Sequence, residues 1–153
     1  MSQLNRLFKY EAYFQLHEIA NCPPTTYKEQ NLTAYRYIFD DLKDDRNFKP
    51  VYILDKDYPK RLNAAKDMEM KCKGFGLSLY QNKNGALANY NRWLAKTNGK
   101  FARIVGSQIA TIQIMAHDGV CSEIENGDTH FTFFEFETTN LVEKIEGKPD
   151  LLI

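Results

Sequence analysis

The sequence lacks several features that would place it in a broad class at once. No stretch approaches the ~20 apolar residues that a membrane span needs. Residues 1–10 have no apolar run of the signal-peptide kind, because Arg6 and Lys9 interrupt them. The 20 Lys and Arg residues balance 20 Asp and Glu residues, so the chain has no overall basic field for nucleic acid. We therefore expect no membrane insertion and no strong nucleic-acid partner.

Cysteine is also scarce. The chain has three, Cys22, Cys72 and Cys121, an odd number in a sequence without an export signal. This pattern predicts reduced thiols, no intramolecular disulfide and a cytoplasmic location.

One of these cysteines has two interpretations. Cys72 lies between Lys71 and Lys73, and neighbouring cations favour a thiolate. With His130 and either Asp118 or Asp128 it could form a nucleophilic set, although a packed cysteine is the commoner outcome.

Phosphate-loop and metal-ligand patterns are missing too. Gly74-Phe75-Gly76 comes before an expected strand rather than after one, and Gly99-Lys100 lacks the hydroxyl that would follow in a phosphate loop. His117 and Cys121 are four residues apart, but the turn-forming pair Asp118-Gly119 separates them. We expect no metal site.

The sequence does contain enough apolar residues for one core. Of its 153 residues 43% are hydrophobic and 13% aromatic, which favours a single folded domain over residues 1–153. Hydrophobic periodicity predicts main helices over 2–20 and 84–96 and a short one over 60–71. Strands are expected over 33–39, 50–54, 76–80, 108–115, 120–124 and 130–136, with turns at 118–119 and 126–128. Without regular βαβ alternation, this order predicts an α+β fold with a mixed or mostly antiparallel sheet.

The last of these strands has a pattern of its own. Phe131, Phe133, Phe134 and Phe136 cannot all face one way, because side chains alternate along a strand. We therefore expect a central strand that is covered on both faces.

Five residues within or next to these strands suggest a nucleotide site. Arg36 offers a planar fork of donors that suits a diphosphate, and Ser78 follows a glycine-flanked segment where a ribose or phosphate could approach. Glu135 and Glu137 could stabilise the oxocarbenium-like centre that forms when a glycosidic bond breaks. His130 opens the same strand as the glutamates, either as a ligand-contacting acid/base or as a structural histidine.

In this order of residue types the chain resembles the arginine–serine–glutamate class of the ADP-ribosyltransferase superfamily. The resemblance implies NAD as the candidate cofactor. It gives Arg36 and Ser78 binding roles, and Glu137 the catalytic role beside Glu135. The sequence has Leu77-Ser78-Leu79 where that class has a longer hydroxyl-rich motif.

A second resemblance is to a set of small bacterial proteins that offer no activity to transfer. It involves Cys22-Pro23-Pro24, Asn47-Phe48-Lys49-Pro50, Cys72 with Gly76-Leu77-Ser78, Asp118-Gly119 and Thr129-His130-Phe131.

Two functional hypotheses therefore stand beside each other. The first is an ADP-ribosyltransferase-like domain that binds NAD or another nucleotide. The alternative is a non-enzymatic intracellular module that binds a protein partner through an aromatic surface. If these residues form no site, Arg36 is a surface cation on an edge strand, Ser78 is an ordinary strand hydroxyl, and Glu135 and Glu137 face outward and suppress aggregation.

Overall fold

The protein is built on a six-stranded sheet in a computed structural model that describes residues 7–125 and 129–153. The strand order is β4-β5-β2-β1-β3-β6, and every described pairing is antiparallel. The strands are β1 (Leu32–Ile38), β2 (Leu77–Tyr80), β3 (Gln108–Ile114), β4 (Gly119–Cys121), β5 (His130–Glu135) and β6 (Asp150–Leu151). The predicted α+β class with a mostly antiparallel sheet is confirmed.

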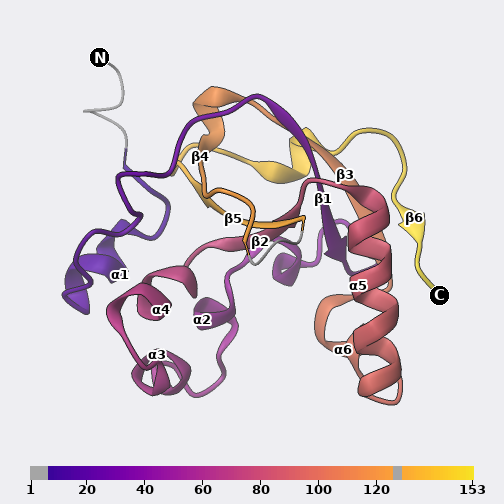
Figure 1. Cartoon of the computed structure of the whole chain (residues 1–153), viewed down its shortest axis with the longest axis horizontal. Helices are drawn as coiled ribbons and strands as arrows, with labels where there is room; N and C mark the ends of the chain where they lie inside the picture. The colour runs from indigo at the N-terminus through magenta and orange to yellow at the C-terminus, as the bar shows by residue number, and fades with distance from the viewer. Residues whose placement is uncertain (1–6, 126–128) are drawn as a thin grey trace.

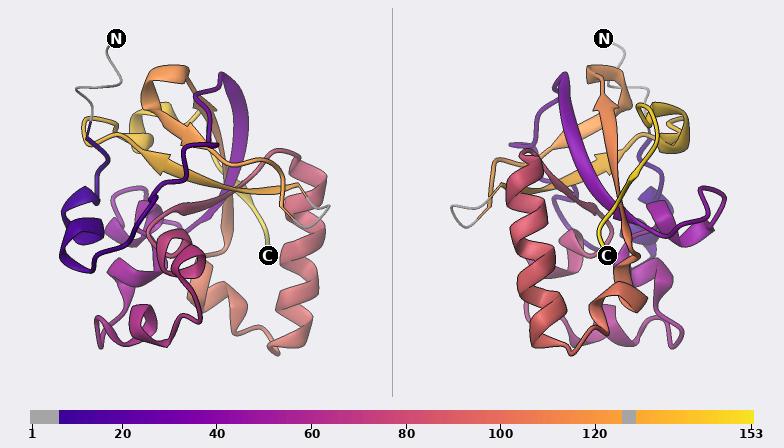
Figure 2. Two further views of the ribbon diagram at one scale, coloured as in Figure 1. Left: turned by 60° about the vertical axis from the view of Figure 1, so that its left-hand side comes forward. Right: turned by 90° about the vertical axis from the view of Figure 1, so that its right-hand side faces the viewer.

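Short helices lie on both sides of this sheet. Figure 1 shows α1 to α4 gathered on one side and the hairpin of α5 and α6 on the other, and Figure 2 shows α5 running alongside the sheet. The α-helices are α1 (Glu11–Leu16), α2 (Val51–Leu54), α3 (Lys60–Ala64), α4 (Met68–Lys73), α5 (Lys83–Lys96) and α6 (Phe101–Val105). Single 3₁₀ turns occur at η2 (Asp45–Phe48), η3 (Ala116–Asp118) and η4 (Leu141–Lys144). None of the helices in the described part of the chain has both the length and the apolarity that a bilayer crossing requires.

The centre of the sheet contains an incomplete seam. β1 pairs with β3 through seven residues, from Leu32↔Ile114 to Ile38↔Gln108. On its other side, β1 shares only the pair Tyr35↔Tyr80 with β2. Backbone groups along the rest of this seam therefore need partners other than the neighbouring strand.

The sheet buries a cluster on each face. Phe131 and Phe133 belong to a cluster with Ala34, Ile38, Leu77, Leu79 and Ile112, whereas Phe134 and Phe136 pack with Phe14, Tyr52, Leu62 and Phe75. All four phenylalanines of β5 and its end are buried. The prediction of an interior strand that is covered on both faces is confirmed.

Several predicted elements differ from the structure. The single helix expected over 60–71 is divided into α3 and α4, the strand expected over 120–124 ends at Cys121, and α5 is the one long helix of the described residues where two main helices were expected.

The expected helix over 2–20 is much shorter, because α1 ends at Leu16 and Glu18 then adopts a left-handed φ of 53°; residues 2–6 lie outside the described residues, as does the turn expected at 126–128. The segment 50–54 is helical rather than extended. Pro50 precedes its first turn, and the ring of Tyr52 packs so closely over Gly74 that a Cβ there would lie 2.1 Å from it. This long-range contact outweighs the local strand propensity.

The prediction of three reduced thiols is wrong. Cys22 and Cys72 form a disulfide, which ties the loop after α1 to α4, and Cys121 is free and buried. Cys72 is therefore not available as a thiolate nucleophile. The cytoplasmic location stays a prediction, and it loses the support that reduced cysteines gave it.

Candidate functional site

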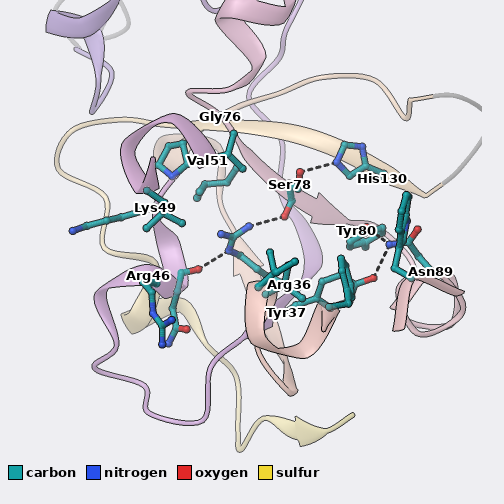
Figure 3. A pocket seen from close by; sticks show the side chains of 18 of the residues that line it. Arg36, Tyr37, Arg46, Lys49, Val51, Gly76, Ser78, Tyr80, Asn89 and His130 are labelled. Atoms are coloured by element: carbon teal, nitrogen blue, oxygen red, sulfur yellow. Dashed lines mark hydrogen bonds between the residues drawn. The ribbon is translucent and has the colours of Figure 1, made fainter. Parts of the chain in front are cut away.

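A cavity of about 590 Å³ opens beside the seam between β1 and β2. Its walls come from β1, β2, the start of β5, the segment around η2 and α2, and the helices α5 and α6 (Figure 3). Of the described side chains that line it, five are cationic: Arg36, Arg46, Lys49, Arg61 and Lys73. The one carboxylate among them is Glu125. The cavity is therefore electropositive although the whole chain is neutral.

Arg36 fills the incomplete seam with its side chain. Its Nη1 donates to the carbonyl of Ser78 at 2.9 Å, and its Nε donates to the carbonyl of Asn47 at 2.6 Å. Among the described residues, no carboxylate oxygen lies within 4 Å of this guanidinium, so Arg36 forms no ion pair with them. Burial lowers the pKa of Arg36 to about 10, although the more distant charge of Glu135 partly offsets this. The group is thus a cation at neutral pH, held by neutral acceptors.

The side chain of Asn47 fixes the loop whose carbonyl accepts from Arg36. This buried amide accepts from the backbone of Phe39 at 2.7 Å through Oδ1 and donates to the carbonyl of Asp41 at 3.0 Å through Nδ2. Since Asn47 belongs to η2, these bonds hold the 3₁₀ turn against the end of β1. The sequence analysis assigned no role to Asn47 because its partners are backbone groups, which leave no mark in the sequence.

Ser78 and His130 meet on one face of the sheet. In the β2–β5 pairing Ser78 is opposite Thr132 and Tyr80 is opposite His130, so these four residues share a face. The Nε2 of His130 lies 2.9 Å from the Oγ of Ser78 (Figure 3). The ring of His130 also packs edge-on against Tyr80, with centroids 5.5 Å apart. Ser78 is exposed to the cavity between buried neighbours, which places its hydroxyl on a rigid strand.

Glu125 completes this group from the loop before β5. Its Oε1 lies 3.2 Å from the Nδ1 of His130 and accepts a hydrogen bond of 2.7 Å from the hydroxyl of Thr132. Its Oε2 pairs with Lys73 at the end of α4. Burial acts to raise the pKa of Glu125, but the bonds from Lys73 and Thr132 outweigh it and hold that pKa below its ordinary value. Sequence reasoning missed Glu125, which follows the expected strand over 120–124 without any local signature.

The two glutamates proposed from the sequence do not line the cavity. Glu135 is five residues beyond His130, an odd number, so strand alternation turns it to the opposite face. It is only 4% exposed, and its Oε2 accepts from Lys9 at 2.9 Å. Burial raises the pKa of Glu135, with Lys9 and Arg36 acting against the rise. The expectation that Glu135 faces outward and suppresses aggregation is therefore wrong, whereas Glu137 is exposed. The structure thus brings Arg36, Ser78 and His130 together but leaves out the predicted catalytic pair.

Aromatic side chains of α5 and α6 form an aromatic wall on one side of the cavity. Trp93 on α5 stacks with Phe101 on α6, with ring centroids 6.3 Å apart and planes inclined by 25°. Trp93 is 41% exposed, and the Nζ of Lys96 lies over its ring, 5.1 Å from the centroid.

The described residues form no cluster suited to binding a metal ion. Within residues 7–125 and 129–153, no group of three or more His, Cys, Asp or Glu side chains is placed to hold a metal ion. Comparisons of the chain with protein-family models, with curated proteins and with solved structures find no match. The function must therefore be argued from the cavity itself.

Proposed function

We propose that the cavity beside the β1–β2 seam binds a small anionic ligand of the nucleotide class, with a phosphate group against Arg36. The observation that carries this proposal is the Arg36 guanidinium, which lines the cavity and bonds only to the carbonyls of Ser78 and Asn47 among the described residues. A desolvated cation without a carboxylate gains most from an anion that can accept its remaining N–H donors.

The other cations support an anionic ligand to different degrees. Three of them already have acidic partners: Arg46 pairs with Asp44, Lys49 with Asp45, and Lys73 with Glu125 and Glu69. The guanidinium of Arg61 has no ion pair within 4 Å in the described part of the chain. Arg36 and Arg61 are thus the two cationic groups most available to phosphate oxygens.

The aromatic wall supports the second part of the ligand. The indole of Trp93 would accept a planar base by stacking if the side chain of Lys96, whose Nζ lies 5.1 Å from the ring centroid, moves aside, and such contacts tolerate different bases. Because Trp93 and Phe101 line the same cavity as Arg36, one ligand with an anionic end and an aromatic end suits it. NAD and adenine nucleotides share this chemistry.

ADP-ribosyl transfer is not included in this proposal, because neither Glu135 nor Glu137 lines the cavity. The protein-interaction alternative gains no specific support either. It needs an exposed aromatic surface, and among the Phe, Tyr and Trp side chains of the described residues Trp93 alone is largely exposed.

Calorimetric titration with ADP and with NAD tests the proposal. Arg36→Gln removes a charge-assisted contact worth roughly 1.5–3 kcal/mol, so affinity should fall about 10- to 150-fold. Arg61→Gln, at an exposed position, should weaken binding only a few-fold. The matched control is Arg103→Gln on α6, an exposed arginine that does not line the cavity; it should bind like the wild type. The absence of heat with millimolar ADP or NAD and folded wild-type protein would exclude the proposal.

A further inference from the structure

We propose that Ser78, His130 and Glu125 form a nucleophilic triad that cleaves carboxylic esters in this cavity. The three residues come from β2, from β5 and from the loop before β5, and all three line the same cavity. The anionic character of the substrate rests on the proposed function, whereas the nucleophile does not.

The distances give each member its role. The Oγ of Ser78 lies 2.9 Å from Nε2 of His130, and the Nδ1 of His130 lies 3.2 Å from Oε1 of Glu125. An ionised carboxylate only accepts hydrogen bonds, so of the two neutral tautomers of the imidazole it selects the one that carries its proton on Nδ1. Nε2 is then left with a lone pair directed at the hydroxyl of Ser78. This is the order of contacts that a serine nucleophile, its general base and an orienting acid require.

The neighbours of Glu125 keep this tautomer in place. Thr132 donates to the same oxygen that faces His130, and Lys73 pairs with the other oxygen. These bonds fix the carboxylate group at both oxygens and favour its charged form. Glu125 is therefore a positioning residue, which acts through His130 and does not touch the substrate.

The reaction follows in two balanced steps. The hydroxyl proton of Ser78 moves to Nε2 of His130 while Oγ bonds to the ester carbonyl carbon. The bond from that carbon to the alcohol oxygen then breaks, and His130 returns the proton to the leaving alcohol. Water repeats the sequence on the acyl-serine, which releases the carboxylic acid and restores Ser78. The cation of Arg36, bonded to the carbonyl of Ser78 itself, is near enough to stabilise the negative charge that develops on the ester carbonyl oxygen.

The cavity also indicates which esters it favours. Its cationic lining suits an ester that carries a phosphate or carboxylate group elsewhere in the molecule. The predicted substrate class is therefore an acyl ester of a small anionic alcohol.

Covalent labelling tests the nucleophile independently of nucleotide binding. An alkyl fluorophosphonate should modify wild-type protein at Ser78, since Oγ displaces fluoride while His130 takes the proton; peptide mass spectrometry locates the adduct. Ser78→Ala should abolish labelling, and Ser107→Ala, which removes a half-buried serine outside the cavity lining, should leave it unchanged. His130→Gln keeps the Ser78 hydroxyl and should slow its labelling at least 100-fold. Wild-type protein that is folded but unlabelled at Ser78, or equal labelling rates in His130→Gln, would refute the triad.

Ester hydrolysis tests the reaction and the role of Glu125. Wild-type protein should release p-nitrophenol from p-nitrophenyl acetate, and Ser78→Ala should not. Glu125→Gln should lower kcat on the order of 100-fold or more with KM little changed, because the acid orients the base and does not bind substrate. A fall in Glu125→Gln that lies wholly in KM, or release from p-nitrophenyl phosphate without release from the acetate, would overturn the assignment.

Discussion

Breaking the disulfide between Cys22 and Cys72 tests how strongly the loop after α1 is held to α4. The two cysteines are separated by 50 positions, and loop-closure entropy over that length corresponds to about 4 kcal/mol of stabilisation. This is a large fraction of the ~5–15 kcal/mol by which small domains are usually stable. Residues 17–31 contain no helix and no strand of the sheet, so few backbone bonds replace the disulfide when it is cut.

The assay is urea denaturation followed by circular dichroism, with and without dithiothreitol. Reduction should lower the free energy of unfolding by up to about 4 kcal/mol. The double variant Cys22→Ala/Cys72→Ala should already be destabilised and should not respond to dithiothreitol. This control separates loss of the bond from any effect of the reductant on Cys121, the remaining thiol.

Alkylation counts the thiols directly. Under denaturing conditions without reductant, iodoacetamide should modify one cysteine per chain, and peptide mapping should place it at Cys121. Denaturant is needed because Cys121 is buried and burial raises its pKa to about 12, which suppresses the reactive thiolate. Three alkylated cysteines in unreduced protein, with a denaturation midpoint that dithiothreitol does not move, would refute the reasoning.

The fold could be predicted from the sequence wherever burial repeats with a regular period. The runs over 33–39 and 130–136 correspond closely to β1 and β5, and the apolar face over 84–96 corresponds to α5. The prediction failed where a distant contact decides the local structure, as at residues 50–54, where Tyr52 packs on Gly74. It also missed β6, since two residues that pair with the edge of β3 form no periodic pattern.

Only part of the candidate site could be predicted from the sequence. Arg36, Ser78 and His130 lie on predicted strands, so their residue types and positions could be recognised. Glu125 lies outside any strand, and its N–H donates to the carbonyl of His130 at 2.8 Å, which brings the two side chains together. This loop closure leaves no periodic pattern in the sequence. The orientation of Glu135 away from His130, in contrast, could be predicted from strand alternation, because their positions differ by five, an odd number.

Two further predictions concern the sheet. Phe133 is 0% exposed in the cluster with Leu77 and Phe131, so Phe133→Ala should lower the free energy of unfolding by about 3–5 kcal/mol. Leu16→Ala, at a 70% exposed position, is its control and should cost little; a loss below ~1 kcal/mol at Phe133 contradicts its interior position. Glu135→Gln should change the pH dependence of stability. Burial raises the folded-state pKa of Glu135 above its ordinary value of 4.5, so between these two values the folded protein holds more protons than the unfolded chain. The contribution of Glu135 to wild-type stability is then fullest below pH ~4.5 and is lost as pH rises through the folded-state pKa. The glutamine variant has no such proton to lose, so its stability relative to wild type should increase from pH 4 to pH 7 in urea titrations. Parallel stability curves for the two proteins over that range would show that Glu135 ionises in the folded sheet as readily as it does in water.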